Sequence, residues 1–167
     1  LDTEITDSTK NVIIEAAIFD GVKVRKTSKE ILRSEASSRF EKGLDPNRTY
    51  MAMERACKLL EEYASGEVVG GIAKYDKEDL SNREIEISFT KINDVLGMNI
   101  AKKDVLDVFR RLEFDVIING KKSDFTETEK DLENCESIVV SVPRRRGDIS
   151  IKEDLIEEVG RIYGVDN

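Results

Sequence analysis

The chain contains no histidine and only two cysteines among its 167 residues. Without histidine, it lacks the commonest general base and metal ligand. Cys57 and Cys135 form neither a CxxC pair nor a disulfide framework, and Cys57 lies in an apolar helical pattern that indicates a buried thiol. No apolar run reaches the length of a membrane span, and the start does not resemble a signal peptide. These absences predict a soluble, cytoplasmic protein with no membrane partner.

Charged side chains make up 37% of the chain, and acidic residues are in excess, with a net charge of -8. Because phosphates are attracted by local positive charge, this balance argues against a broad nucleic-acid-binding surface, although it leaves room for a local basic patch. The apolar fraction of 39% is sufficient for a core. The length fits one ordinary domain or two small ones.

The first strand and helix signals lie before residue 31. The run NVIIEAAIF, residues 11–19, is β-branched and apolar and predicts a buried strand with Glu15 inside it. Thr27 and Glu30 have the spacing of a capping box with Thr27 as N-cap. A lone carboxylate in a strand usually faces water, but it can also line a pocket and accept a hydrogen bond from a ligand hydroxyl. The pattern leaves both interpretations of Glu15 open.

A longer helix is predicted from the LDP motif onward. Asp45 is the expected N-cap, Pro46 the first helical residue, and the helix runs to about Ala64, where Gly66 ends it. The expected core face of this helix consists of Met53, Ala56, Leu60 and Tyr63.

A polar, loop-like stretch at residues 74–82 predicts a domain boundary. Beyond it, EIEISF predicts a half-buried strand. Thr90 is expected to cap a short helix that Gly97 closes. A second helix, KKDVLDVFRRLEF, is expected to bury Val105, Val108, Phe109 and Leu112.

The dipeptide Asn119-Gly120 is a strong turn signal, but the polar stretch 121–136 predicts a longer connection before the next strand, SIVVSV. The order of strand, two helices and two or three further strands predicts an α+β protein of two small domains. The second domain would be winged-helix-like, that is, similar to a DNA-binding domain, although element order alone does not establish this arrangement.

Carboxylates are concentrated at the end of the chain. Asp154, Glu157 and Glu158 share one face of a predicted helix, and Asp148 precedes it closely enough to fold back beside them. Magnesium prefers such oxygen ligands. Equally, acids early in a helix favour its positive end, and Glu157 with Arg161 fits an i,i+4 pair, so the pattern leaves both interpretations open. The apolar stripe of this helix is Ile151, Leu155, Val159 and Ile162.

The motif PRRRGD places Arg144, Arg145 and Arg146 side by side. Such a cluster either contacts phosphate or an acidic partner, or forms a solvated basic turn. No Ser-His-Asp or Cys-His arrangement, Walker loop or GxGxxG motif is present, so no catalytic residue is expected in the chain.

Two stretches resemble bacterial phenylalanyl-tRNA synthetase β subunits. These are SEASSRFEKGLDPNRTYMAMERACKLL, residues 34–60, and VPRRRGDISIKEDLIEEVGRIYGVDN, residues 142–167. NVIIEAAIFD and FRRLEFDV fit the same family in the same order, so the resemblance covers nearly the whole chain.

The resemblance implies a fragment. Residues 1–73 would form the C-terminal part of an editing module, 74–150 a small winged-helix-like domain, and 151–167 a helix leading into a catalytic-like module that is missing. The whole enzyme would use ATP to attach phenylalanine to its tRNA, with most of the active site in an α subunit. The implied partners are that α subunit, a second α–β pair in a heterotetramer, and tRNA(Phe). The chain alone is therefore expected neither to aminoacylate nor to edit.

The resemblance also assigns two sets of site residues. In the family, carboxylates at the positions of Asp148, Asp154, Glu157 and Glu158 are Mg²⁺ ligands shared with the α subunit. The position of Glu15 recognises the phenolic hydroxyl of a mischarged tyrosine, and the positions of Ser34 and Ala36 lie beside the same pocket.

Two departures put other roles in doubt, since the family often has histidine where Ser38 stands and an aromatic residue where Arg145 stands. An alternative function is a non-enzymatic module, in which residues 83–142 bind nucleic acid or a protein.

Overall fold

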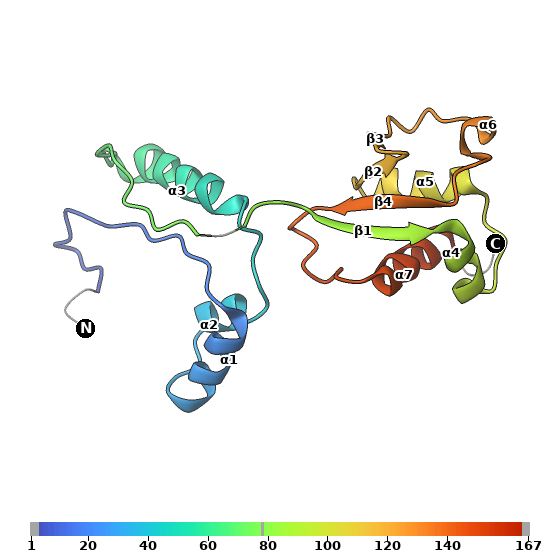
Figure 1. Ribbon diagram of the computed structural model, residues 1–167. Helices are drawn as coiled ribbons and strands as arrows, with labels where there is room; N and C mark the ends of the chain where they lie inside the picture. The colour runs from blue at the N-terminus through green and yellow to red at the C-terminus, as the bar shows by residue number, and fades with distance from the viewer. Residues whose placement is uncertain (1–3, 78, 165–167) are drawn as a thin grey trace. The chain divides into compact units, whose positions relative to one another are not determined.

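The computed structural model describes residues 4–77 and 79–164, and the chain divides into two units, Leu1–Glu78 and Asp79–Asn167 (Figure 1). The outermost residues of the expected editing and closing segments, 1–3 and 165–167, lie outside the described residues. Within the described part of the chain, no helix is long and apolar enough to cross a membrane.

Unit 1 contains three helices, of which the first begins at an aspartate cap. The side chain of Asp20 accepts hydrogen bonds from the backbone N–H groups of Val22 (2.9 Å) and Lys23 (3.2 Å). The predicted capping box is therefore wrong, because Thr27 lies inside this helix and Glu30 is its last residue. The three helices are α1 (Gly21–Glu30), α2 (Glu35–Phe40) and α3 (Arg48–Ala64).

Helix α3 starts two residues later than predicted and ends where predicted. Asp45 does not cap it; its carboxylate accepts from the Asn47 N–H at 3.1 Å in a turn before the helix. Ser65 takes a left-handed conformation, and the Gly66 N–H returns to the Leu60 carbonyl, which completes the helix end. The expected core face is not buried: Met53, Ala56 and Leu60 are half-buried, and the side chain of Tyr63 is exposed.

The predicted strand at residues 11–19 is also wrong. This segment is extended without strand pairing, Glu15 is exposed, and Ile13 is 100% exposed. A strand needs hydrogen-bonding partners for its N–H and C=O groups, and the described strands all lie in unit 2. In the described part of unit 1, no hydrophobic side chain is fully buried.

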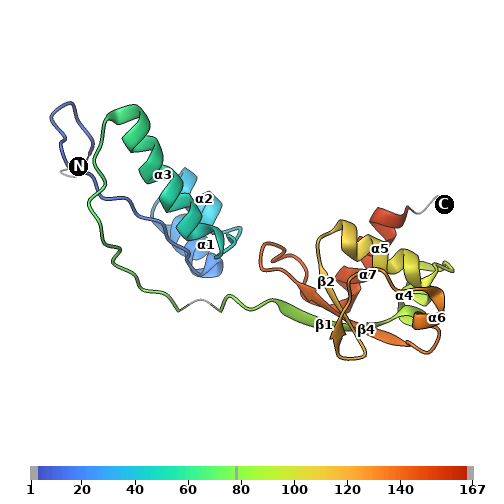
Figure 2. The ribbon, with the colours of Figure 1, turned by 90° about the horizontal axis from the view of Figure 1, so that it is seen from above.

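Unit 2 is built on a four-stranded antiparallel sheet with the order β1-β4-β2-β3 (Figure 1). Figure 2 shows the helices of this unit beside the sheet. The predicted alternation in the first strand is confirmed, since Ile85 and Ile87 are buried while the glutamates between them are exposed. Val140 lies opposite Ile85 on one side and Val116 on the other, so the three share one face of the sheet. The strands are β1 (Arg83–Ser88), β2 (Asp115–Ile118), β3 (Lys121–Lys122) and β4 (Ser137–Val142).

Helices pack on this face and close one continuous core, which confirms the predicted α+β class. Ser88, and not the predicted Thr90, caps the first helix by accepting from the Lys91 N–H at 3.2 Å. Gly97 ends that helix in a left-handed conformation, as predicted. The next helix buries Leu106 in addition to three of the predicted residues, and Leu112 is half-buried. The helices are α4 (Phe89–Leu96), α5 (Lys102–Arg111), α6 (Glu129–Leu132) and α7 (Lys152–Tyr163).

The turn at Asn119 and Gly120 has positive φ angles of 50° and 76°, as a tight hairpin requires. The strand β3 follows it directly and pairs with β2, so the expectation of an immediate long connection is wrong. The long polar connection runs from the end of β3 to β4 and contains α6.

The closing helix α7 is part of unit 2. Leu155 and Val159 of the predicted stripe are buried, and Ile156 joins them in the core. Ile162 is half-buried and Ile151 is exposed. The polar residues of this helix are therefore fixed relative to the sheet by its apolar side.

Candidate functional site

The three consecutive arginines before α7 reach three different parts of unit 2. The Arg144 Nε donates to the Asp79 carbonyl at 2.9 Å. The Arg145 guanidinium donates to the Leu112 carbonyl at the end of α5 (3.0 Å) and pairs with Glu113 (3.1 Å). Each guanidinium therefore has partners within the chain, while the Arg145 side chain stays 42% exposed.

Arg146, the third arginine, joins Asp148 to α7. Its Nε and Nη2 donate to the two carboxylate oxygens of Asp148 at 2.6 to 3.1 Å. Its Nη1 donates to Glu158 Oε2 at 3.2 Å, and its Nη2 lies 3.0 Å from Glu158 Oε1. The guanidinium thus brings together two of the four carboxylates that the sequence predicted as a metal site.

Glu158 is the most buried member of the group, with 7% of its surface exposed. Besides Arg146, it accepts from Arg161, one turn further along α7. Hydrogen bonds from Arg146 hold the pKa of the Glu158 carboxyl below its usual range, and those from Arg161 act in the same direction. Arg161 was expected to pair with Glu157 and instead pairs with Glu158, because only Glu158 points toward the body of unit 2.

Asp154 has a structural role at the start of α7. Its Oδ2 accepts from the backbone N–H groups of Ser150 (2.7 Å) and Ile151 (3.0 Å). These two bonds are the main reason that the pKa of Asp154 lies below its usual range. Its Oδ1 makes no hydrogen bond to another described residue. Asp154 therefore stabilises the helix end, as the alternative interpretation of the acidic cluster predicts.

Glu157 is exposed and makes no hydrogen bond or ion pair among the residues that the structure describes. Across residues 4–77 and 79–164, no three histidine, cysteine, aspartate or glutamate side chains are arranged to hold a metal ion. The carboxylate oxygens of Asp148, Asp154, Glu157 and Glu158 nevertheless suit Mg²⁺ chemically. In this arrangement, Arg146 occupies Asp148 and Glu158, so the four acids fit a cation only if that guanidinium moves away.

Sequence reasoning did not identify Arg146 as part of this group. The one available signal was that Glu158 falls beside Leu155 and Val159 of the apolar stripe, where a carboxylate is buried and needs a cationic partner. That signal predicts a partner but cannot say which arginine supplies it.

The residues expected at the editing pocket lie in unit 1 and are all exposed. Ser34 is the N-cap of α2 and accepts from the Ser37 N–H at 3.1 Å, and Ala36 lies within that helix. Glu15 lies on the extended segment that ends at Phe19. The Phe19 ring packs edge-on against the Phe40 ring of α2, with 5.0 Å between the ring centroids. This contact ties the end of that segment to the helix that carries Ser34 and Ala36.

Three other side chains from the sequence analysis have defined surroundings. Ser38, at the first departure from the family pattern, is half-buried and accepts from Arg33 Nε at 3.4 Å. Cys57 is half-buried, not buried as predicted. Cys135 is buried, and this burial raises the pKa of its thiol, so Cys135 lacks the features of an activated nucleophile.

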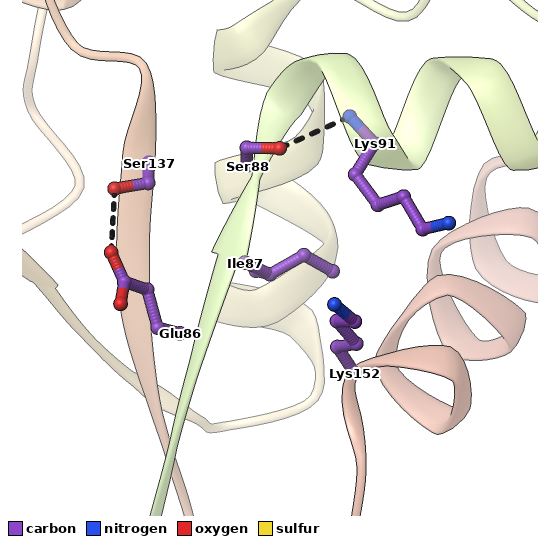
Figure 3. A pocket seen from close by; sticks show the side chains of 6 residues that line it. All are labelled: Glu86, Ile87, Ser88, Lys91, Ser137 and Lys152. Carbon is purple, nitrogen blue, oxygen red and sulfur yellow. Dashed lines mark hydrogen bonds between the residues drawn. The ribbon is translucent and has the colours of Figure 1, made fainter.

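Unit 2 also has a pocket of about 380 Å³ where β1 and β4 meet the beginnings of α4 and α7. Figure 3 shows the side chains of Lys91 and Lys152 on one side of β1, while the Glu86 carboxylate, which accepts from Ser137 Oγ at 3.0 Å, lies on the other. Among the described residues, neither lysine has an ion-pair partner. The pocket is lined by Glu86, Ile87, Ser88, Lys91, Ser137 and Lys152.

Two protein families match the chain in succession. Residues 1–65 match the B3/4 domain, and residues 85–165 match the tRNA synthetase B5 domain. The first match covers the helices of unit 1, and the second covers the sheet, helices and acidic group of unit 2.

The chain as a whole is similar to curated proteins from several bacteria. It is 44% identical to the phenylalanine–tRNA ligase beta subunit of Bacillus subtilis over 99% of the chain, and 45% identical to that of Bacillus licheniformis over the same share. It is 46% identical to the Staphylococcus epidermidis protein of that name over 98% of the chain. In each case the chain spans only 19% of the relative's length.

Proposed function

Because this chain is a homologue of one segment of the bacterial phenylalanine–tRNA ligase beta subunit, we propose that it acts within a ligase that uses ATP to attach phenylalanine to tRNA(Phe). The observation that carries the proposal is the similarity over 99% of the chain, in which a B3/4 match is followed by a B5 match. The partners are an α subunit, a second α–β pair in a heterotetramer, and tRNA(Phe), and the complex is cytoplasmic.

In this proposal, unit 1 supplies part of a proofreading pocket for tyrosine mistakenly attached to tRNA(Phe). Glu15 accepts a hydrogen bond from the phenolic hydroxyl, with Ser34 and Ala36 beside the same pocket. Phenylalanine has no hydroxyl, so it would leave the carboxylate desolvated and unpaired, and it is therefore rejected. The exposure of all three residues is consistent with a pocket whose other walls come from residues outside this chain.

Unit 2 supplies carboxylates for a Mg²⁺ site completed by the α subunit. The proposed ligands are Asp148, Asp154, Glu157 and Glu158. The metal would supply positive charge between two subunits that both contribute oxygen ligands. Glu157 supports this role best, because it is exposed on α7 and has no hydrogen bond or ion pair within the described chain.

The test is phenylalanine-dependent charging of tRNA by the full-length β subunit combined with its α partner. Glu157→Gln removes one proposed ligand without disturbing a contact inside the described chain, and should lower charging by about tenfold or more at low Mg²⁺. Raising the Mg²⁺ concentration should restore part of the activity.

Glu153→Gln is the matched control, because Glu153 is a second exposed acid of α7 outside the proposed ligand set. Equal charging by both variants and the unmodified enzyme would remove the metal role and leave the ligase assignment. Absence of charging by the unmodified complex would remove the ligase assignment itself.

The second candidate function is nucleic-acid binding by unit 2 without catalysis. The observation that favours it is the pair of lysines at the pocket beside β1, which carry no counter-charge within the described chain. The net charge of -8 and the internal contacts of Arg144 and Arg145 count against it. Binding of duplex DNA regardless of its sequence would favour this candidate if the affinity falls steeply with salt concentration. The affinity should also fall in the Lys91→Ala variant.

A further inference from the structure

Arg146 is enclosed by acceptors on several sides. Its Nη2 lies 2.6 Å from Asp148 Oδ2 and 3.0 Å from Glu158 Oε1, and its Nε and Nη1 reach the remaining oxygens of the same two carboxylates. Its Cζ lies 5.8 Å from the centroid of the Phe114 ring, within the range of a cation–π contact. The guanidinium therefore supplies a positive charge between these groups, and only 24% of the Arg146 side chain is exposed.

This arrangement pairs both carboxylate oxygens of Asp148 and both of Glu158 with Arg146. Each of the four oxygens already lies within hydrogen-bond distance of Arg146, and Arg161 takes part of Glu158 as well. A divalent cation needs direct contact with such oxygens at a much shorter distance than a guanidinium keeps. A divalent cation that bridges both carboxylates therefore takes the place that the Arg146 guanidinium occupies between them.

We propose that Arg146 is a built-in counter-ion for Asp148 and Glu158, which a divalent cation must displace in order to bind the acidic side of α7. The proposal rests on the metal site of the proposed function and adds a competitor to it. With Arg146 in place, the four acids and the two arginines carry a formal charge of -2, and without it -3. Withdrawal of the guanidinium thus strengthens the attraction for a divalent cation as well as freeing the oxygens.

The exchange also links the site to the loop at residues 143–151. Arg146 anchors this loop to α7, while Arg144 and Arg145 anchor it to Asp79 and to the end of α5. Release of Arg146 removes one contact of this loop with α7, while the bonds from Ser150 and Ile151 to Asp154 and the contacts of Arg144 and Arg145 remain. Cation binding therefore changes how the loop is held against Glu158.

The test is binding of Mn²⁺, a spectroscopic substitute for Mg²⁺, to the 167-residue chain, measured by electron paramagnetic resonance. Arg146→Met should bind Mn²⁺ about tenfold more tightly than the unmodified chain or better. Arg146→Lys keeps the charge but loses the planar fork, so its affinity should fall between the two. Arg110→Met is the matched control, because it makes the same change in net charge and removes an arginine paired with Asp107 on α5.

Circular dichroism identifies any variant that does not fold, in which case Arg146→Lys carries the comparison. The unmodified chain and the folded Arg146 variants could bind Mn²⁺ equally tightly, with binding lost in Asp154→Asn. That result would keep the cation site and overturn the displacement. A tenfold gain in Mn²⁺ affinity that also occurs in Arg110→Met would overturn the displacement too. No binding by any chain at about 10 mM Mn²⁺ would overturn the displacement in this chain, whereas the metal site completed by the α subunit is tested by the charging assay of Glu157→Gln. Charging of tRNA plays no part in this readout, so failure of the ligase assignment is detected separately.

Discussion

The Lys102 ammonium lies 2.8 Å from the backbone carbonyl oxygen of Cys135, and it also donates to the carbonyls of Leu132 (2.7 Å) and Glu133 (3.1 Å). One side chain at the start of α5 thus satisfies three carbonyls around the end of α6, within the connection that leads to the central strand β4. The same ammonium lies 5.6 Å from the centroid of the Phe89 ring. This single cation joins α5, α6 and the first residue of α4.

Replacing Lys102 with methionine should destabilise unit 2 by about 1–3 kcal/mol, because the carbonyls lose their donor while the apolar stem of the side chain is kept. The free energy of unfolding in urea, followed by circular dichroism, measures the effect. Lys103→Met is the control, since the neighbouring lysine is exposed. Equal losses in the two variants would show that the three contacts contribute no net stability.

The ion pairs of Arg146 predict how stability depends on pH. The carboxyls of Asp148 and Glu158 have pKa values below their usual 3.8 and 4.5, in each case chiefly through hydrogen bonds from Arg146. A carboxyl with a lowered folded-state pKa stabilises the fold above its unfolded pKa, and this contribution is lost as the pH falls through the folded pKa. Unit 2 should therefore lose stability as the pH falls from about 5 to about 3.

Glu158→Gln should weaken this pH dependence and cost about 1–3 kcal/mol at pH 7, because it removes the carboxylate that both arginines share. Urea unfolding at several pH values, with the unmodified chain measured alongside, provides the comparison. An unchanged slope in the variant would show that Glu158 titrates alike in the folded and unfolded states.

The two units should differ in protection from hydrogen exchange. Every fully buried hydrophobic side chain in the described part of the chain lies in unit 2, between Ile85 and Val159, whereas α3 buries none. Backbone amides of α5 and β4 should therefore exchange only through global opening of unit 2, and those of α3 should exchange much faster. Exchange followed by mass spectrometry on the whole chain measures this, and equal protection of α3 and α5 would contradict it.

Glu15→Ala in the full-length subunit, paired with its α partner, should slow hydrolysis of Tyr-tRNA(Phe) by about a hundredfold or more and reduce the preference over Phe-tRNA(Phe). In the proposed pocket, this variant loses the acceptor for the phenolic hydroxyl. Asp7→Asn is the control, since Asp7 is another exposed acid on the same N-terminal segment. Unchanged hydrolysis in Glu15→Ala would remove this residue from the pocket.

The 167-residue chain by itself should neither charge tRNA(Phe) nor hydrolyse Tyr-tRNA(Phe). It contains no histidine to act as a base, and the proposed pocket residues are all exposed. Charging and hydrolysis are both measured on the purified chain, with the complete α–β enzyme as the positive control. Measurable hydrolysis by the chain would show that its own residues complete the editing site.

Local signals in the sequence were enough to predict most elements of unit 2. The alternation of Ile85 and Ile87, the helix end at Gly97 and the turn at Asn119 and Gly120 are each encoded within a few neighbouring residues. These signals act through backbone preference and periodic burial, which do not depend on distant partners. The resemblance to phenylalanyl-tRNA synthetase β subunits was likewise readable from contiguous motifs, and the comparisons confirm it.

The sequence by itself determined the α+β class, most elements of unit 2 and the resemblance to one segment of phenylalanyl-tRNA synthetase β subunits. Only the tertiary structure decided which partners the distant groups find: residues 11–19 have strand composition but no strand to pair with, and Arg146 meets Glu158 across twelve positions of the chain. Strand pairing and ion pairing are set by which segments the core brings together. The periodicity of the sequence does not predict which segments meet. Three adjacent arginines therefore contact three different parts of unit 2 although their local sequence is the same.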